Sequence, residues 1–362
     1  HGGKIMATFD VVIEGFSMEA TESQALRMSR EPLVQSVEEN GVIQIDDDLV
    51  ASGLTPANAV KMTIEDERAL YTVPDLFDQE IKEKKIKDNF KPPKGFRSYK
   101  NGIEKNDFEI TGSQGTSSGL WGLDRIDQRD LPLNNSYNYE RVGALASGKV
   151  VHVYVVDTGI SMPHQEFGGR AVAGFDAFTD NRNGEDCHGH GTHVAGIIGG
   201  ATVGVAKEVM LHSVRVLACN GGGSESSVLQ GMNWITTNHI KPAVVNMSLG
   251  TNGYRSRIID DAVRNSISAG ITYVVAAGNG YADASLSSPS GVAEAICVGA
   301  TGKYDKRSSF SNFGPLVDLF APGENVYSAN LNNGYTFRTG TSMAAPHVAG
   351  VVAQYLESRF NS

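Results

Sequence analysis

Apolar and polar positions change their periodicity several times along the chain, and the clearest pattern lies in the C-terminal two thirds. Continuous apolar runs rich in β-branched residues occupy positions 150–156, 210–216, 243–247 and 271–277. Stretches with helical periodicity follow at 192–199, 226–239, 257–269 and 342–358. Continuous apolar runs are typical of parallel strands buried on both faces. Strands that alternate with helices predict an α/β domain with three layers, a parallel sheet covered by helices on both faces.

The first forty residues read as a separate, smaller unit. The segment KIMATFDVVIEG alternates like a strand, and residues 33–38 read as a second strand. Between them, Thr21 and Gln24 form a T-x-x-Q capping box that opens a short helix ending before Pro32. We therefore expect a small α+β domain over residues 1–41.

Residues 42–119 have a different character. They are rich in charge, contain Pro92-Pro93 and show no clear period, and they end in the segment GSQGTSSG at 112–119. Such composition is typical of a disordered linker with one short amphipathic helix, and a regulatory insert is the alternative. We expect residues 112–119 to be flexible and to contain a proteolytic maturation site, between Gly112 and Leu120. The globular domain would then cover residues 120–362.

Composition restricts the class of protein. With 362 residues, 40% hydrophobic and 20% charged, the chain has enough apolar material for a large core. The net charge of −10 argues against nucleic acid as the main ligand. No apolar run approaches the roughly 18 residues of a membrane span. The chain begins at His1, so we expect a processed or truncated chain.

Polar residues beside glycine follow three of the predicted strands. Asp157 lies in VVDTGI, Ser248 in VVNMSLG and Asn279 in VVAAGN. A single Asp after a strand is usually a turn or cap residue. Three such residues at the carboxyl ends of parallel strands indicate one shared cleft instead.

The segment HGHGTHVAG contains His188, His190 and His193 at the start of a predicted helix. One interpretation is a metal cluster, because residues three apart share a helix face. The neighbouring glycines and the missing HExxH carboxylate favour a general base instead. His190, at the glycine-rich helix start, is the candidate base, and His193 is expected to pack in the core.

Ser342 opens the last predicted helix, in GTSMAAPHVAG. As a helix N-cap its hydroxyl would only bind backbone N–H groups. The same position places it beside unpaired N–H groups and the positive end of the helix dipole, which suits a nucleophile next to a developing oxyanion.

DTGI, HGHGTHVAG, AAGN and GTSMAAPHVAG, in this order, resemble the subtilisin-like serine peptidases, or subtilases. WGLDRIDQRDLPL, VEENG and SSFSNFG are similar to the proteinase K-like branch and its aqualysin-like members. The resemblance runs from about Trp121 to Phe360. It implies the subtilisin-like fold and a secreted serine endopeptidase that acts on polypeptides through an acyl-enzyme and needs no catalytic cofactor. We expect a monomer. An esterase of the G-x-S-x-G type is disfavoured, because GTSMA does not fit that motif.

The resemblance also implies roles for individual residues. Ser342 would be the nucleophile, His190 the base and Asp157 its orienting carboxylate. The Asn279 side chain and the Ser342 backbone N–H would form the oxyanion hole. An extended substrate would pair by β-augmentation with two backbone segments, formed by Gly221, Gly222 and Gly223 and by Ser248, Leu249 and Gly250.

Disulfide and metal assignments follow from the same resemblance. Cys187 and Cys219 match a disulfide of aqualysin-like members, which leaves Cys297 as a buried free thiol. A disulfide implies an oxidising compartment, in agreement with secretion. Structural calcium is expected at two places, of which the first could also be an acidic surface turn. The ligand candidates are Asp124, Asp127 and Gln128 at the first place and Asp318 with the carbonyls of Ala293 and Ala295 at the second.

Residues 5–40 resemble the later part of the subtilase inhibitor prodomain, whose first strand and helix we do not find. The resemblance implies a precursor that cuts itself and is inhibited by its own prodomain, whose C-terminus passes through the cleft. The long segment before Trp121 departs from the short connection of relatives and leaves that geometry open. A binding protein that uses its catalysis for a single self-cleavage is the alternative function.

Overall fold

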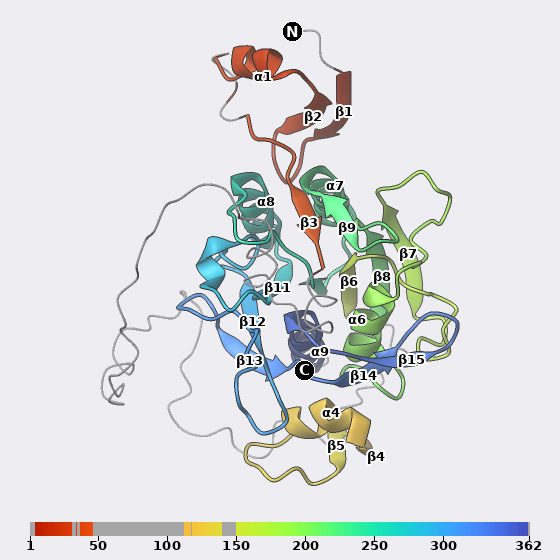
Figure 1. Cartoon of the computed structure of the whole chain (residues 1–362). Helices are drawn as coiled ribbons and strands as arrows, with labels where there is room; N and C mark the ends of the chain where they lie inside the picture. Colours follow the sequence, from red (N-terminus) through yellow and green to blue (C-terminus); the bar gives the residue numbers. More distant parts are fainter. Residues whose placement is uncertain are drawn as a thin grey trace, which may run out of the picture.

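The computed structural model describes residues 4–30, 34, 37–45, 112–116, 118–139 and 150–360 (Figure 1). Its largest part is an α/β domain, and a small N-terminal unit lies on top of that domain in this view. In the small unit, strands β1 (Lys4–Phe9) and β2 (Gly15–Glu19) pair antiparallel. Helix α1 (Glu22–Met28) follows, and the predicted capping box of Thr21 and Gln24 is confirmed.

A seven-stranded sheet forms the centre of the large domain, in the order β13-β12-β11-β10-β6-β8-β7. All its strand pairs are parallel. The strands are β6 (His152–Asp157), β7 (Ala171–Asp176), β8 (Met210–Arg215), β10 (Ala243–Met247), β11 (Thr272–Ala276), β12 (Ile296–Thr301) and β13 (Leu319–Pro322). The predicted parallel sheet is confirmed, and it also contains β7, β12 and β13, which the sequence pattern did not indicate.

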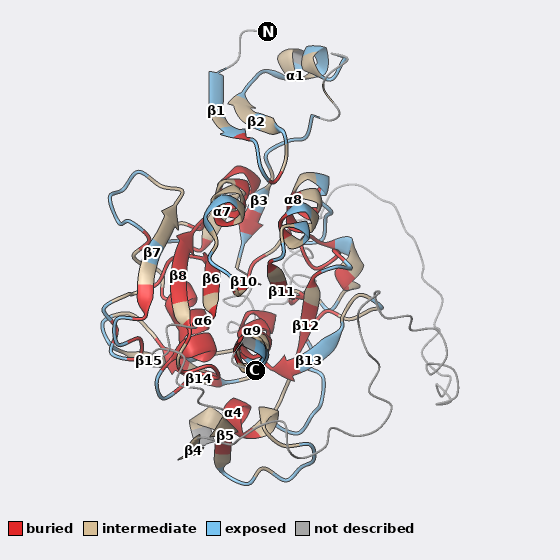
Figure 2. Ribbon diagram, turned by 180° about the vertical axis from the view of Figure 1, so that it is seen from behind, coloured by how far each residue is buried: buried red, intermediate tan, exposed pale blue. Residues whose placement is uncertain are grey.

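Helices cover both faces of this sheet (Figure 2). They are α6 (His190–Gly199) and α9 (Thr341–Phe360) on one face, and α7 (Glu225–Asn238) and α8 (Arg257–Ser268) on the other. Strand β6 shows how the two cores arise. Val153 and Val155 belong to the cluster with α6 and α9, whereas Tyr154 and Val156 belong to the cluster with α7 and α8. Successive side chains of a strand point to opposite faces, so one apolar run fills two cores.

Smaller elements border the sheet. Helix α4 (Trp121–Ile126) packs near the antiparallel pair formed by β4 (Gly112–Gly115) and β5 (Ser136–Tyr139). Strands β14 (Val326–Ala329) and β15 (Tyr335–Arg338) pair antiparallel beside α6. The remaining elements are β3 (Val42–Gln44), β9 (Gly222–Ser224) and the short 3-10 helices η1 (Ser118–Leu120) and η2 (Ala284–Leu286). Among the described residues, no helix combines the length and apolarity that crossing a membrane requires.

Two expectations about the N-terminal third are wrong. Val34, Val37 and Glu38 do not lie in a strand; the strand of this region is β3, a few residues later. The reason is tertiary, because β3 pairs with β9 of the large domain. Residues 112–115 are not a flexible stretch but strand β4, paired residue by residue with β5. Most of the segment between β3 and β4 lies outside the described residues.

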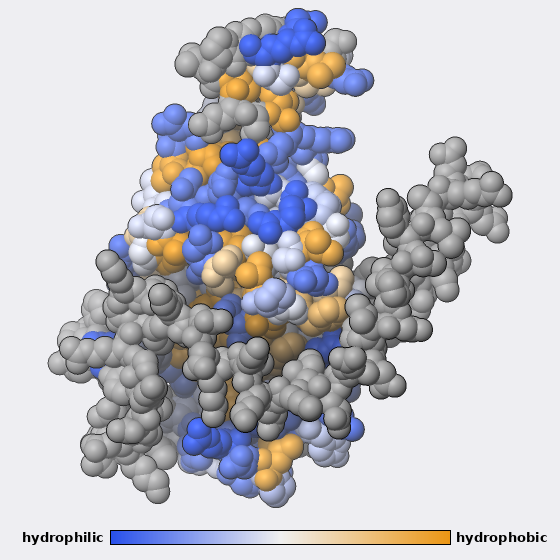
Figure 3. All heavy atoms as spheres, turned by 90° about the vertical axis from the view of Figure 1, so that its left-hand side faces the viewer, coloured by the Kyte–Doolittle hydropathy of each residue, from blue (hydrophilic) through white to orange (hydrophobic). Residues whose placement is uncertain are grey.

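The small unit contacts α7 and α8 through few residues. Phe9 and Val12 are buried in the same cluster as the apolar side chains of these helices. Asn233 of α7 accepts the N–H groups of Val11 and Val12, and Asn265 of α8 donates to the Val12 carbonyl. Elsewhere the unit exposes apolar surface (Figure 3), with Ile5 and Met6 more than half exposed.

Candidate active site

The carboxyl ends of three adjacent strands meet at one edge of the sheet. Asp157 is the last residue of β6, Ser248 follows β10, and Asn279 lies three residues after β11. Met247 pairs with Val156, so Ser248 and Asp157 lie next to each other across the two strands. All three side chains are at most 2% exposed. The three side chains that we expect to share a cleft are therefore buried together at one edge of the sheet, which positions them.

Asp157 and His190 form a buried carboxylate–imidazole pair. The Nδ1 atom of His190 lies 2.8 Å from Asp157 Oδ1 and 2.9 Å from Oδ2. A carboxylate only accepts, so Nδ1 carries the proton and Nε2 is left as the basic nitrogen. His190 begins α6 directly after Gly189, which has a positive φ of 99°. Glycine adopts this backbone conformation without strain, and it turns the ring toward the strand.

Asp186 holds this helix start together, and the sequence analysis missed it. Its Oδ1 accepts from the Thr158 hydroxyl at 2.9 Å and from the backbone N–H groups of His188 and Gly189. Its Oδ2 accepts both the N–H and the hydroxyl of Thr192. A carboxylate just before a helix start is a common N-terminal partner, and an acidic residue ahead of HGHGTH was the signal that could have revealed it.

Ser342 lies at the start of α9 and contacts the end of β10. Its hydroxyl donates to the Ser248 carbonyl at 3.3 Å, and the Ser248 hydroxyl donates to the Ser342 carbonyl at 2.9 Å. Asn279 is held beside it, because its Oδ1 accepts the Thr341 N–H at 2.8 Å and the Thr341 hydroxyl at 2.9 Å. Two donors fix Oδ1 as the oxygen, so the side-chain NH₂ is the end that can donate toward the cleft.

His193 does not reach this cleft. Its ring is fully buried, and Nε2 donates to the carbonyls of Val326 and Thr336, each at 3.1 Å. Burial holds its pKa well below the ordinary value. The expected packing of His193 in the core is confirmed. Within the part of the chain that the structure describes, no group of three or more His, Cys, Asp or Glu side chains is arranged to hold a metal.

Two backbone segments flank a strand of the N-terminal region. β9 pairs antiparallel with β3, with Ile43 opposite Gly223 and Gln44 opposite Gly222. On its other side Gln44 forms an antiparallel bridge with Gly250, to whose carbonyl its N–H donates. Gly222, Gly223 and Gly250 thus pair with β3 directly. Ser248 and Leu249, which precede Gly250, are buried. Gly221 precedes β9 and has a positive φ. β3 has the geometry of an extended peptide bound by β-augmentation.

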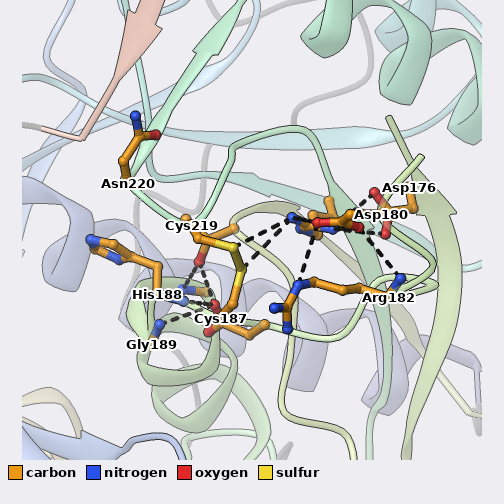
Figure 4. The surroundings of a disulfide bond; sticks show 12 residues. Asp176, Asp180, Arg182, Cys187, His188, Gly189, Cys219 and Asn220 are labelled. Carbon is orange, nitrogen blue, oxygen red and sulfur yellow. Dashed lines mark hydrogen bonds and ion pairs between the residues drawn. A yellow bond between two sulfur atoms is a disulfide. The ribbon is translucent and has the colours of Figure 1, made fainter. Parts of the chain in front are cut away.

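The predicted disulfide between Cys187 and Cys219 is confirmed (Figure 4). Both sulfur atoms lie against the guanidinium of Arg215, at 3.7 and 3.8 Å. Arg215 is 1% exposed and forms ion pairs with Asp176 and Asp180. This cluster joins the loop before α6 to the segment before β9.

Cys297 is free and fully buried, as expected. Burial raises the pKa of its thiol to about 12, so the thiolate is scarce at neutral pH.

The first candidate calcium region contains oxygen atoms without partners. Asp127 Oδ1 and Gln128 Oε1 are buried and accept no hydrogen bond. Burial raises the pKa of Asp127, which a nearby cation would counteract. Asp124 is already occupied, since its carboxylate accepts from Thr116, Asn134 and Asn135. Asp127 and Gln128 therefore fit an oxygen-coordinated cation better than Asp124 does.

The second candidate region lies at the start of β12. Asp318 is exposed, and its Oδ2 accepts the N–H of Cys297 at 2.9 Å. Ala293 and Ala295 lie in the turn that leads into β12, Ala293 exposed and Ala295 buried. One carboxylate and a turn with main-chain oxygens are compatible with a calcium site, although no orphaned buried oxygen marks this region among the described residues.

Known proteins resemble this chain in sequence and in structure. Among the curated relatives, it is 55% identical over 253 residues to an extracellular serine proteinase of Thermus sp., covering 69% of this chain and 60% of the relative. It is 49% identical over 248 residues to alkaline serine exoprotease A of Vibrio alginolyticus, covering 68% and 45%. The chain thus spans about half the length of the curated relatives it matches.

A solved structure and two family models agree with these relatives. The crystal structure of a cold-adapted subtilisin-like serine proteinase matches with a TM-score of 0.62 and 50% identity, covering 66% of this chain and 85% of that one. The model of the peptidase inhibitor I9 family matches residues 1–46. The model of the subtilase family matches residues 148–362, which contain the cleft described above. More than half of the chain matches that model, and the chain belongs to the subtilase family.

Proposed function

We propose that this chain is a serine endopeptidase that hydrolyses peptide bonds through an acyl-enzyme. The observation that carries the proposal is the buried Asp157–His190 pair, at the same sheet edge as Ser342 and Asn279. Ser342 Oγ attacks the scissile carbonyl while His190 Nε2 takes its proton. Asp157 keeps the proton on Nδ1 and stabilises the imidazolium that forms. His190 then returns the proton to the leaving amine, and water hydrolyses the ester by the reverse sequence.

The developing negative charge needs donors at the same place. The Asn279 side-chain NH₂ and the Ser342 backbone N–H are the candidates for this oxyanion hole. Thr341 supports it, because its two hydrogen bonds to Asn279 Oδ1 set the direction of the NH₂ group. The donors are fixed before the reaction, so little reorganisation is needed when charge develops.

The substrate is an extended polypeptide bound between two backbone segments. Gly221, Gly222 and Gly223 form one side and Ser248, Leu249 and Gly250 the other. The support is β3, which already lies between β9 and Gly250. Main-chain hydrogen bonds give affinity for any extended sequence.

β3 also belongs to the segment that matches the inhibitor family. We infer that residues 1–46 act as an inhibitor prodomain in a precursor that cuts itself, and that the first cut lies just beyond Gln44. A cut between Gly112 and Leu120 stays a prediction, but strand β4 gives it no exposed loop at residues 112–115. The Thermus relative, which is named as extracellular, and the disulfide support secretion of this chain.

Structural calcium completes the proposal. Asp127 and Gln128 would hold one ion and Asp318, with the carbonyls of Ala293 and Ala295, a second. A bound ion would supply charge that offsets buried carboxylates and would fix surface loops. Neither region includes the groups proposed to react, so calcium would act on stability and not on the chemical step.

Replacing Ser342 by alanine tests the function. We expect the purified Ser342→Ala chain to stay uncut and to hydrolyse no peptide, while the parent cuts itself and then turns over peptides. Circular dichroism of both chains shows that the fold is retained. Self-cleavage by the alanine variant would show that the nucleophile is another group. A parent that cuts itself but turns over no peptide, even after removal of the prodomain, would support the alternative of a self-cleaving binding protein.

A further inference from the structure

Gly41 and Val42, at the start of β3, contact the large domain in addition to the pairing of β3 with β9, and neither the triad nor the oxyanion hole explains these contacts. At the start of α7, the N–H of Glu225 donates to the Gly41 carbonyl at 3.0 Å. The hydroxyl of Tyr254, in the loop before α8, lies 3.1 Å from the Val42 carbonyl oxygen and 3.0 Å from Glu225 Oε1. Glu225 and Tyr254 therefore meet each other and the peptide main chain at one point.

Close approach at this point depends on Gly41. A Cβ atom added at Gly41 would lie 2.6 Å from Glu225 Oε1 and would collide with the Tyr254 hydroxyl. The two side chains thus close directly onto the backbone of the peptide. Glu225 is 4% exposed, so the carboxyl group is largely removed from solvent.

The Tyr254 hydroxyl has one proton and two acceptors. When Glu225 is ionised, the carboxylate is the stronger acceptor and takes that proton. The Val42 carbonyl then faces an oxygen that donates nothing to it. When Glu225 is protonated, its O–H can donate to the Tyr254 oxygen, and the Tyr254 proton turns to Val42. Only when Glu225 is protonated can Glu225 donate a hydrogen bond to Tyr254 while Tyr254 donates one to the Val42 carbonyl.

We propose that Glu225 and Tyr254 form a further main-chain subsite for extended peptides, whose hydrogen bond to the peptide carbonyl is switched on by protonation of Glu225. This proposal rests on the proposed function, because the subsite binds the same extended peptide as the candidate active site, which in this structure is the prodomain segment around Val42. It holds the prodomain more tightly in acid and loosens it as the pH rises.

The surrounding groups favour this switch. Burial is the main cause that raises the pKa of Glu225, and the negative charge of Glu38 on the prodomain segment raises it further. Hydrogen bonds from Tyr254, Ser256 and the backbone at Gly41 act in the opposite direction and are outweighed. Burial also raises the pKa of Tyr254, which keeps its proton throughout. A carboxyl pKa raised in the docked state means that docking takes up a proton, so docking weakens as the pH rises through that pKa.

Hydrogen exchange in the full chain tests the proposal. The Ser342→Ala background keeps the chain intact, and mass spectrometry follows the amides of residues 40–45 at pH 5 and pH 8. After correction for intrinsic exchange, we expect their protection to fall about 3- to 10-fold at the higher pH, the loss of roughly one hydrogen bond. The readout does not depend on peptidase activity. If the Ser342→Ala chain still cuts itself, the mass of the intact chain shows the cleavage, and exchange of the same amides is then followed in the N-terminal fragment that stays docked.

Four variants separate the switch from a structural role. Glu225→Gln should stay protected at both pH values, because its NH₂ group donates to Tyr254 as the protonated acid does. Tyr254→Phe should be weakly protected at both. Glu38→Gln should shift the transition to lower pH, since a like charge is lost. Glu14→Gln, at an exposed carboxylate of the small unit, should behave as the parent. Equal protection of the parent at both pH values, or a pH-dependent loss that persists in Glu225→Gln, would overturn the proposal.

Discussion

Asn279, the proposed oxyanion donor, shows how neighbouring groups fix the orientation of a single side chain. Its carbonyl end is saturated by the N–H and hydroxyl of Thr341, and this leaves one orientation for the amide. His190 is fixed in the same manner by both oxygens of Asp157. In each case a buried oxygen must accept a hydrogen bond, because an acceptor buried without a partner costs about 1–3 kcal/mol. This need fixes the orientation of the Asn279 amide and the position of the proton on His190.

We predict that Asn279→Ala lowers kcat about 10²- to 10³-fold with little change in KM, the range measured for one such donor in subtilisin. Thr341→Val keeps the backbone donor and loses only the hydroxyl, so kcat should fall less, on the order of tenfold, through poorer positioning of the amide. Steady-state kinetics on a peptide substrate measures both. An Asn279→Ala enzyme with unchanged kcat would remove Asn279 from the oxyanion hole.

Two histidines far from the cleft predict acid sensitivity. His152 Nδ1 lies 2.8 Å from His212 Nε2, and burial lowers the pKa of His212 to about 4 and also lowers that of His152. A lowered pKa means that the folded state prefers the neutral ring. The contribution of the neutral His212 ring to stability is therefore present above the ordinary pKa of about 6.5. It is lost as the pH falls toward 4, because the unfolded chain takes up the proton first.

His212→Gln should therefore reduce the loss of stability between pH 7 and pH 4, by on the order of 1–2 kcal/mol. The measurement is Tm as a function of pH, and the slope matters rather than the absolute Tm. His239→Gln, whose parent ring bonds the Thr236 carbonyl, is the control. Equal slopes for the parent and His212→Gln would show that this pair does not contribute to acid lability.

At the scale of elements, the disulfide joins two parts of the site. Cys187 lies three residues before the start of α6, and Cys219 lies three residues before β9. The bond therefore ties the helix of the candidate base to the strand of the peptide cleft. Arg215 packs beneath it and fixes the same loop through Asp176 and Asp180.

We predict that the Cys187→Ser, Cys219→Ser double variant is less stable by about 3–4 kcal/mol, from a bridge that spans 32 residues. KM should rise several-fold because β9 is less well fixed. Denaturant unfolding with and without reductant gives the stability. The parent under reductant should match the double variant, and Cys297→Ala should keep its response to reductant. A parent that is fully reduced yet equally stable would contradict the prediction.

At the scale of the whole molecule, the small N-terminal unit is held by three kinds of contact with the large domain. Phe9 and Val12 enter its apolar cluster, Asn233 and Asn265 bind its backbone, and β3 completes a strand pair at the cleft. The same chain thus provides both the cleft and the peptide that fills it. If residues 1–46 act as the proposed inhibitor, a precursor with this arrangement carries it at a high effective concentration.

Calcium belongs to this scale because it would act on the stability of the molecule. We predict that a chelator lowers Tm while the kcat of enzyme that remains folded is unchanged. Asp127→Ala should remove part of the calcium-dependent gain in Tm, and Asp318→Asn another part. Thermal scans with calcium and with chelator measure this gain. A chelator without effect on Tm would contradict calcium at both regions.

The sequence alone determined the fold class, the four central strands of the sheet and the candidate groups. Apolar runs rich in β-branched residues, such as residues 150–156, are typical of strands buried on both faces, and glycine-rich motifs around Asp157, His190 and Ser342 stand out without tertiary knowledge. The capping box at Thr21 could be predicted for the same reason, because its hydrogen bonds join residues three apart. Such features depend on neighbours in sequence, which a local pattern contains.

Only the tertiary structure decided where the N-terminal segment pairs. Residues 33–38 have a strand-like composition, yet β3 forms at Val42–Gln44, because Gly222–Ser224 and Gly250 offer backbone partners there. Residues 112–115 look flexible and nevertheless form β4, because β5 lies opposite. Asp186, and the meeting of Glu225 with Tyr254, likewise depend on contacts between distant segments. Backbone hydrogen bonds depend little on side chains, so the choice of partner strand leaves hardly any trace in the local sequence.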